Sequence, residues 1–370
     1  MQEDLRYLLA LSSIPVIGPG TTRKLLKAFG EPKNIFRASL KALLQVEGVG
    51  KGRAQGIVNF TAWDETDKII EKCEKTGIKI LHYEDAGFPA LLKDVPDHPL
   101  ILFVKGQIRQ EDRYAIAIVG TRKASHYGIS VTERFTDELT AMGFTIVSGM
   151  ARGIDSVAHK KAIQNNASTI AVLGSGVDVV YPPESAWLYK RIAEEGAVVS
   201  EFLPGTKPLR ENFPVRNRLI SGLSLGVLVV EASQRSGALI TAEFALEQGR
   251  EVFAVPGNIM SSSFVGTHSL IQKGAKLVQS AGDIVEELRH ILKGFVKSKK
   301  KAGADAVVDE EIALDTEEKR LCEFISHEPI HIDEIIRKSG VASNEALTLL
   351  LGLEIKGVVR QIDGKKFQLV

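Results

Sequence analysis

The chain has few cysteines, few aromatic residues and no long apolar run. Its two cysteines, Cys73 and Cys322, lie in unlike segments without a neighbouring Cys/His cluster, which argues against a disulfide framework and a zinc site. No run approaches the ~20 apolar residues of a membrane span. The opening Met-Gln-Glu-Asp-Leu-Arg lacks the basic start and apolar stretch of a secretory signal. We therefore expect a cytoplasmic protein with no membrane contact.

Nucleotide-binding fingerprints are also missing. The turn after the apolar segment 115–119 reads Gly-Thr-Arg-Lys where dinucleotide folds have Gly-x-Gly-x-x-Gly, and Leu173-Gly-Ser-Gly176 is followed by Val179 at the third glycine position. No Gly-x-x-x-x-Gly-Lys-Ser/Thr loop occurs, and no serine lies in a Gly-x-Ser-x-Gly elbow. We expect no cofactor and, in particular, neither NAD nor FAD.

Between residues 114 and 292 the sequence alternates short apolar segments with helical ones. The apolar segments are 115–119, 144–147, 169–173, 197–201, 227–231 and 252–255. This alternation predicts an α/β fold with a doubly wound, mostly parallel, Rossmann-like sheet. Segments 78–81 and 100–104 are expected to add strands to that sheet.

The most informative segment is Ser148–His159, where Gly149 and Gly153 crowd the junction of a strand and a helix. Open α/β sheets bind ligands at such turns, which favours an anion site. A tight turn that needs glycine for backbone reasons alone is an equal alternative. Asp155 and His159 are spaced i, i+4, and we expect structural roles for them rather than an acid–base pair.

Basic residues gather in two other segments of the same region. Arg122 and Lys123 end the first turn, and the proline-rich segment 203–218 has a net charge of +3 and one aromatic residue. A guanidinium forks onto phosphate, and cations with an aromatic suit a single strand, whose unpaired bases stack. We predict DNA contacts from Gly120, Thr121, Arg122, Lys123, Gly149, Gly153, Lys207, Arg210, Phe213, Arg216, Asn217 and Arg218.

Structural alternatives stay open for part of this set. Arg216 and Arg218 stand next to a predicted helix start, where fixing the loop to the sheet has equal weight, and Phe213 suits the core as well. The segment 236–243 either contacts a phosphate or merely caps a helix.

A repeat near the start suggests a second binding module. Residues 14–26 and 46–58 share one pattern at an offset of 32, and residues 13–60 have a net charge of +6. The pattern resembles a paired helix-hairpin-helix module, which presents backbone N–H groups to DNA phosphates. The accessory DNA contacts would be Gly18, Gly20, Gly48, Gly50 and Gly52. Val16 stands where the second copy has Gly48 and weakens the first hairpin; a protein-contact domain is the alternative.

The C-terminal part reads as three helices followed by a hairpin around Asp363-Gly364, which predicts a winged helix. Its helix 344–356 carries two glutamates and no cation before Lys356, which favours protein contact or scaffolding over DNA reading. We predict four parts: helix-hairpin-helix domain 1–62, Rossmann-like domain 63–292, linker 293–313 and winged helix 314–370.

Six motifs together closely resemble the bacterial DNA processing protein A (DprA/Smf) family. They are Ile118–Arg122, Ser148–Asp155, Gly174–Pro182, Phe213–Arg218, Ser236–Thr241 and Val255–Gly257. The resemblance implies a protein that binds and protects single-stranded DNA without sequence preference, loads the RecA recombinase in natural transformation, and is not a catalyst. It also implies a homodimer with contacts near His268, Leu270, Ile271 and Leu277, although Leu270, Ile271 and Leu277 also suit the core. Gly-Thr-Arg stands here where Gly-Ser-Arg is common.

Two other functions remain open. A nucleotide phosphoribohydrolase of the LOG type would carry Pro-Gly-Gly-x-Gly-Thr-x-x-Glu, whereas this chain has only Ser-Gly-Ala-Leu-Ile-Thr-Ala-Glu at 236–243. A pure interaction hub would show no affinity for nucleic acid at low salt.

Overall fold

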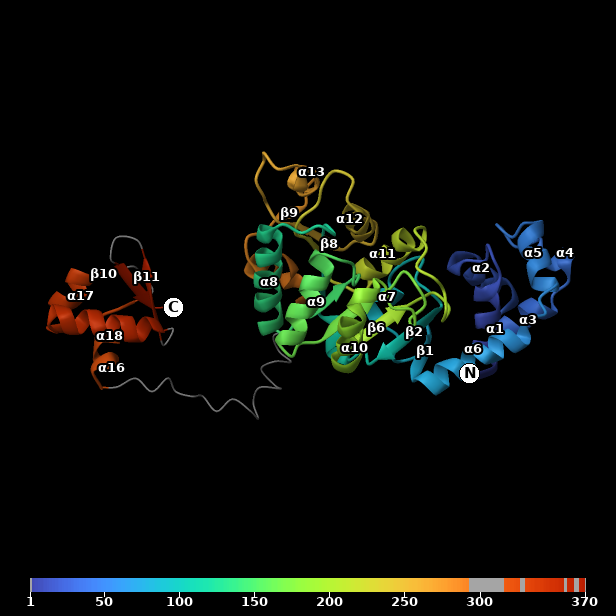
Figure 1. Cartoon of the computed structure of the whole chain (residues 1–370), viewed down its shortest axis with the longest axis horizontal. Coiled ribbons are helices and arrows are strands. Elements are labelled where there is room, and N and C mark those ends of the chain that lie inside the picture. Colours follow the sequence, from blue (N-terminus) through green and yellow to red (C-terminus); the bar gives the residue numbers. More distant parts are fainter. Residues whose placement is uncertain (1, 293–315, 327–329, 356–357, 363–365, 370) are drawn as a thin grey trace. The chain divides into compact units, whose positions relative to one another are not determined.

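The structure is a computed structural model that describes residues 2–292, 316–326, 330–355, 358–362 and 366–369. The chain divides into two compact units, residues 1–292 and residues 293–370 (Figure 1). The predicted linker 293–313 and the Asp363-Gly364 turn lie outside the described residues. Among the described helices, none has the length and apolar character needed to cross a bilayer.

Helices alone build the start of the first unit. They are α1 (Gln2–Ser13), α2 (Pro19–Phe29), α3 (Pro32–Arg37), α4 (Leu40–Leu43), α5 (Lys51–Val58) and α6 (Trp63–Thr76). Two equivalent turns precede α2 and α5, and both place a residue in the left-handed region, Val16 at φ 67° and Gly48 at φ 83°. Arg53 joins the two turns, because its guanidinium donates to the carbonyl oxygens of Val16 and Gly48. The helix-hairpin-helix prediction is confirmed.

A nine-stranded sheet forms the centre of the unit. Its strands are β1 (Ile78–His82), β2 (Ile101–Gly106), β3 (Ala115–Val119), β4 (Thr145–Ser148), β5 (Thr169–Val172), β6 (Ala197–Ser200), β7 (Gly226–Val229), β8 (Glu251–Ala254) and β9 (Lys276–Leu277). Their order is β1-β2-β6-β5-β4-β3-β7-β8-β9. The pairs from β6 to β9 are parallel, whereas β1 and β2 are antiparallel additions. The doubly wound, mostly parallel sheet is therefore confirmed, including its two added strands.

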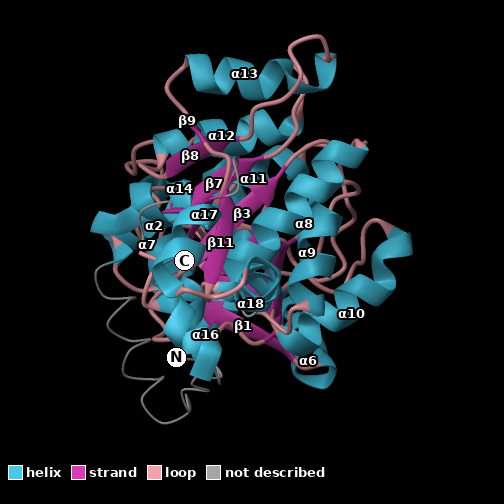
Figure 2. Cartoon of the chain, turned by 90° about the vertical axis from the view of Figure 1, so that its left-hand side faces the viewer, coloured by secondary structure: helices cyan, strands magenta, loops and turns pink. Residues whose placement is uncertain are grey.

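Helices cover both faces of the sheet, as right-handed crossovers require. On one face α7 (Ala90–Lys93), α11 (Asn212–Gly222) and α12 (Gly237–Glu247) enclose a core with Leu92, Leu219 and Ala242. The other face carries α8 (His126–Ala141), α9 (Ile154–Gln164) and α10 (Ala186–Glu195), to the right of the strands in Figure 2. Four 3-10 turns, η1 (Gln110–Arg113), η2 (Pro183–Ser185), η3 (Ser262–Phe264) and η4 (Leu288–His290), and helices α13 (Val265–Gln272) and α14 (Ala281–Glu287) complete the unit.

The strand order reverses at β3. From β3 the chain runs to β4, β5 and β6 on one side and, after α11, to β7, β8 and β9 on the other. Loops that leave the carboxyl ends of β3 and β7 consequently diverge and open a crevice, the position where doubly wound sheets hold ligands.

The second unit is a small winged helix. It contains α16 (Thr316–Cys322), β10 (Ile330–His331), α17 (Ile332–Ser339), α18 (Ser343–Ile355), β11 (Val359–Ile362) and β12 (Lys366–Leu369), with strand order β10-β12-β11. Leu321, Ile335, Leu350 and Phe367 form its core. The predicted architecture is confirmed, and α18 coincides with the predicted helix 344–356 within one residue at each end.

The left-handed turn residues give a stability prediction. Val16 is exposed and holds a backbone conformation that β-branched residues rarely adopt. We expect Val16→Gly to raise the free energy of unfolding by about 1 kcal/mol, because it relieves that strain. The reverse change in the equivalent turn, Gly48→Val, should lower it by a similar amount. Urea unfolding of the full chain, followed by the fluorescence of Trp63 in a Trp187→Phe background, measures both; equal shifts of one sign would contradict the account.

Candidate nucleic-acid interface

The crevice at β3 and β7 is an open groove of about 750 Å³. Gly120, Thr121 and Arg122 line it from the loop after β3, and Arg235 and Ser236 line it from the loop after β7. The start of α11 forms the remaining wall with Phe213, Pro214, Arg216 and Asn217. The structure thus brings together segments that lie more than 100 residues apart in the sequence.

Arg216 forms the floor of the groove. Its side chain is 4% exposed, and its Nη1 donates to the carbonyl oxygens of Gly149, at 2.8 Å, and Val172. A Cβ on Gly149 would stand 2.7 Å from Nη2 of this guanidinium. Glycine at this position therefore makes room for an arginine of the same chain.

Gly153 serves the packing of two neighbouring turns. Its φ is +77°, and a Cβ would stand 2.2 Å from the carbonyl oxygen of Thr121. The next residue, Ile154, donates its N–H to that same oxygen at 3.2 Å. Contacts within the chain account for both glycines. Gly149 also lines a small hollow beside the groove, whose other walls include Gly174, Tyr181, Pro182 and Phe213.

Carboxylates of the chain occupy the starts of two helices, α9 at the groove and α8 after the loop that follows β3. Oδ2 of Asp155 accepts hydrogen bonds from the N–H groups of Gly149 and Ala151 at the start of α9, at 3.1 and 3.4 Å. Burial raises the pKa of Asp155 to about 6, against the opposing effect of Arg216. At the start of α8, Oε2 of buried Glu231 accepts the N–H of Ser125 at 3.0 Å. The N–H groups near the starts of these two helices are therefore bonded to carboxylates of the chain and are not free for an anion.

His159 is a core residue. Its Nδ1 lies 2.7 Å from Oγ1 of Thr169, and burial lowers the pKa of the imidazole to about 3. Asp155 and His159 each have their own structural partners, as the sequence analysis expected.

One aromatic ring lines both the groove and the small hollow. The Phe213 ring is half-buried, with the Cζ of Arg122 at 5.4 Å and the Cζ of Arg216 at 5.8 Å from its centroid. The ring of Tyr181 follows at 5.6 Å between centroids. The cation–π contact with Phe213 helps to position the exposed Arg122 guanidinium.

The rim of the groove is cationic. Arg122, Arg210 and Arg235 are exposed residues of its lining, and Lys123 and Lys207 are exposed on the same loops. Sequence reasoning missed Arg235 and Tyr181 as site residues. The only sequence signal for Arg235 was its place directly before Ser236, whose hydroxyl caps α12.

Arg218 does not join the groove. Its guanidinium is buried and ion-paired with Glu201 and, at 3.3 Å, with Asp97. The helical geometry of α11 turns it away from Arg216, so the predicted DNA contact of Arg218 is replaced by a structural ion pair. Asn217 remains at the groove, where its Nδ2 donates to the carbonyl oxygen of Gly237 at 3.3 Å.

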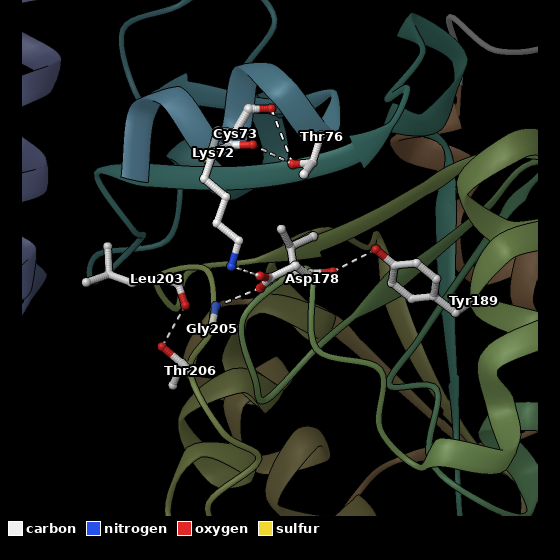
Figure 3. A network of polar contacts seen from close by, with 9 residues as sticks. Lys72, Cys73, Thr76, Asp178, Tyr189, Leu203, Gly205 and Thr206 are labelled. Carbon is white, nitrogen blue, oxygen red and sulfur yellow. Dashed lines mark hydrogen bonds and ion pairs between the residues drawn. The ribbon is translucent and has the colours of Figure 1, made fainter. Parts of the chain in front are cut away.

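A polar network fixes the start of the basic loop (Figure 3). The carboxylate of Asp178 accepts hydrogen bonds from Nζ of Lys72 and, at 2.7 Å, from the N–H of Gly205. Thr206 accepts the N–H of Gly176 at 2.9 Å through its carbonyl oxygen. Tyr189 donates its hydroxyl to the carbonyl oxygen of Val177 at 2.8 Å. The loop that leads to Lys207 and Arg210 is therefore anchored to the loop after β5.

The accessory glycines lie at the two hairpins. Gly18 and Gly50 are the N-caps of α2 and α5, and Gly20 and Gly52 follow inside these helices. Added Cβ atoms at these four positions would meet nothing within 4 Å. This open space is compatible with the predicted backbone contacts to phosphate.

The predicted dimer residues differ in burial. Leu270 is buried in the core and Ile271 packs against it, while His268 Nε2 lies 3.1 Å from the carbonyl oxygen of Gly257. Leu277 alone of these four is exposed, at 43%, on the edge strand β9. For Leu270 the core alternative of the sequence analysis is therefore the one observed.

Fold and groove together define the class: a doubly wound α/β protein with a cationic, aromatic-lined groove at its switch point, preceded in the sequence by a helix-hairpin-helix part and followed by a winged helix. The chain belongs to the DNA recombination-mediator protein A family, which matches residues 79–289. The DprA winged helix domain matches residues 308–365, and a SAM-like helix-hairpin-helix tandem matches residues 8–61.

Relatives extend the match beyond the central domain. Protein Smf of Synechocystis is 33% identical over 98% of both chains. DNA processing protein DprA of Streptococcus pneumoniae is 45% identical over 55% of this chain and 72% of its own. The X-ray structure of the latter superposes with a TM-score of 0.66 and 35% identity, covering 76% of this chain and 96% of that one. A structure of DprA from Helicobacter pylori, described for its single-stranded DNA binding mode, superposes with a TM-score of 0.50 and 27% sequence identity. The match covers 60% of this chain and 96% of that one.

The buried Glu201–Arg218 pair gives a pH prediction. Burial raises the pKa of Glu201 to about 7, above the ordinary 4.5. Between these two values the unfolded chain loses the proton before the folded chain does, so stability falls as pH rises. The stability advantage of the wild type over Glu201→Gln should therefore shrink by about 2 kcal/mol between pH 5 and pH 8.

Urea unfolding at both pH values checks this. The control is Glu184→Gln. Glu184 is exposed, and its hydrogen bond from Arg152 lowers the pKa of its carboxyl group from the ordinary 4.5, so that the group is ionised across this pH range. An advantage over Glu201→Gln that grows with pH would contradict the assignment.

Proposed function

We propose that this chain is a sequence-independent single-stranded DNA-binding protein that protects the strand and helps to load the RecA recombinase in natural transformation. The observation that carries the proposal is the exposed Arg122 guanidinium, stacked on Phe213 at the switch-point groove. The Helicobacter pylori relative, whose structure was described for its single-stranded DNA binding mode, supports the same ligand.

The groove suits a single strand better than a duplex. Its cations contact phosphates without reading bases, and the half-buried Phe213 ring offers a stacking surface that only unpaired bases can use. We infer contacts from Gly120, Thr121, Arg122, Lys123, Gly149, Lys207, Arg210, Arg235, Phe213, Arg216 and Asn217, with Arg216 acting from the floor.

The same geometry supports a binding protein rather than an enzyme. Among the described groove residues, the acid Asp155 is engaged by backbone N–H groups, and Ser236 caps α12. The 236–243 segment offers a helix cap instead of the glycine cradle of a LOG-type hydrolase. Incubation with nucleoside monophosphates tests this; catalytic release of free base would favour the hydrolase.

A cytoplasmic location follows from the proposed partners, single-stranded DNA and the RecA recombinase.

Substitution of Arg122 tests the groove. Arg122→Ala should weaken binding to every single-stranded sequence by roughly tenfold, because a charge-assisted hydrogen bond contributes about 1.5 to 3 kcal/mol. It should also reduce the log–log salt slope by about 0.7 for each phosphate that the variant no longer neutralises. Fluorescence anisotropy with labelled oligonucleotides at several salt concentrations measures both. The control is Arg113→Ala at the opposite edge of the sheet, where an exposed arginine precedes β3; unchanged affinity of Arg122→Ala would refute the assignment.

We further propose that the protein forms a homodimer through the β9 edge, where Leu277 is exposed. Leu277→Glu should shift sedimentation equilibrium toward the monomer, because it places a charge on an apolar contact. Leu44→Glu, at a similarly exposed leucine in the N-terminal helices, is the matched control. Equal effects of both variants, or none, would argue against this edge.

A further inference from the structure

One exposed aromatic residue near the groove is not used by the proposed site. Trp187 lies in the first turn of α10 and is 58% exposed. The other tryptophan, Trp63, packs edge-on against Tyr7, Phe36 and Phe60, with ring centroids 4.9 to 5.3 Å away. An exposed indole offers a large flat surface on which an aromatic ligand can stack.

Topology places Trp187 at the same sheet edge as the groove. Strand β5 ends at that edge, and the loop that follows it supplies Gly174, Tyr181 and Pro182 to the hollow behind Phe213. Helix α10 begins directly after this loop and the short turn η2. The walls of the hollow and Trp187 are therefore consecutive along the chain.

Contacts on both sides hold α10 in this position. Leu188 and Ile192 are buried on its inner face, and Tyr189 is bonded to the carbonyl oxygen of Val177 at 2.8 Å. Arg152, which lines the hollow, is ion-paired with Glu184, three residues before Trp187. Because Leu188 faces inward, its neighbour Trp187 faces solvent on a fixed helix, and little side-chain entropy is lost when a flat ligand stacks on it.

The surface beside Trp187 is compatible with a nucleic-acid backbone. Lys190, one helical turn further, has a side chain that is 77% exposed and forms a solvent-exposed ion pair with Glu194 at 4.0 Å, a contact that a phosphate can displace. A flexible cation one turn from an exposed indole is the combination found in single-strand tracks, where phosphates follow the charge and bases stack.

We propose that Trp187 is a second stacking platform, on which a base of the single strand lies after the strand leaves the groove past Tyr181 and Pro182. The inference rests on the proposed function and extends it, because it gives the strand a direction over the α10 side of the molecule. Strands long enough to reach Trp187 gain a stacking interaction that shorter strands lack.

Intrinsic fluorescence tests this in the full chain. In a Trp63→Phe background Trp187 is the sole tryptophan, and titration with oligothymidylates of increasing length should quench its emission only above a threshold length. Duplexes of the same lengths should not quench it. In anisotropy, Trp187→Ala should weaken binding of strands above the threshold by roughly 5- to 150-fold, the equivalent of about 1 to 3 kcal/mol for one stacked base. Shorter strands should bind as before, and Trp187→Phe should retain most of the gain.

Leu246→Ala is the matched control, since Leu246 is an equally exposed apolar residue, 59%, on helix α12. Unquenched emission at every length, together with wild-type affinity of Trp187→Ala for long strands, overturns the proposal while Arg122→Ala still weakens binding. If the wild-type chain binds no single strand at all, the proposed function fails and this inference fails with it. Circular dichroism confirms that each variant is folded.

Discussion

The buried guanidinium of Arg216 is the constraint on which the groove depends. A charge removed from water must find partners, and this one has two carbonyl oxygens, of Gly149 and Val172, and the nearby carboxylate of Asp155. These partners end β4 and β5 and begin α9, so one side chain ties three elements together. The absence of a side chain at Gly149 follows from it, and the Phe213 ring packs with its centroid 5.8 Å from Cζ of Arg216. Removing one member of such a buried set leaves the others uncompensated, at a cost of about 3 to 5 kcal/mol.

Helix α11 is held at both sides by its two arginines. Arg216 points to the groove floor, and Arg218, two residues later and therefore on the other side of the helix, is paired with Glu201 and Asp97. These anchors explain how a segment as polar as Asn212–Arg218 packs against a sheet. They also fix the wall that carries Phe213, and stacking on a fixed ring loses less entropy than stacking on a mobile one. The network around Asp178 does the same for the loop that leads into α11.

The sequence predicts the sheet and the edge that holds the groove, because apolar segments and strand-to-helix turns are local signals. It does not predict which cations face the groove. Arg216 and Arg218 belong to a helix whose residues Arg216 to Gly222 are all buried, so no amphipathic pattern separates the two. The residues that bind these two guanidinium groups, Gly149 for Arg216 and Glu201 for Arg218, lie elsewhere in the chain. Leu270 and Leu277 pose the same problem: both are apolar, and only the tertiary structure shows that the first is buried and the second exposed.

Charge at the helix starts explains why a Rossmann-like sheet without a glycine fingerprint suits a polymer. Dinucleotide folds hold one pyrophosphate on free N–H groups at a helix start, in one fixed position. Here Asp155 and Glu231 occupy the starts of α9 and α8, and their negative charge would repel a phosphate at those N–H groups. In the function proposed above, phosphates are bound by exposed side chains of the groove lining, Arg122, Arg210 and Arg235, whose flexible stems follow a backbone of variable geometry. A site of this kind does not fix one nucleotide in one position, and it can therefore bind a strand of any base sequence.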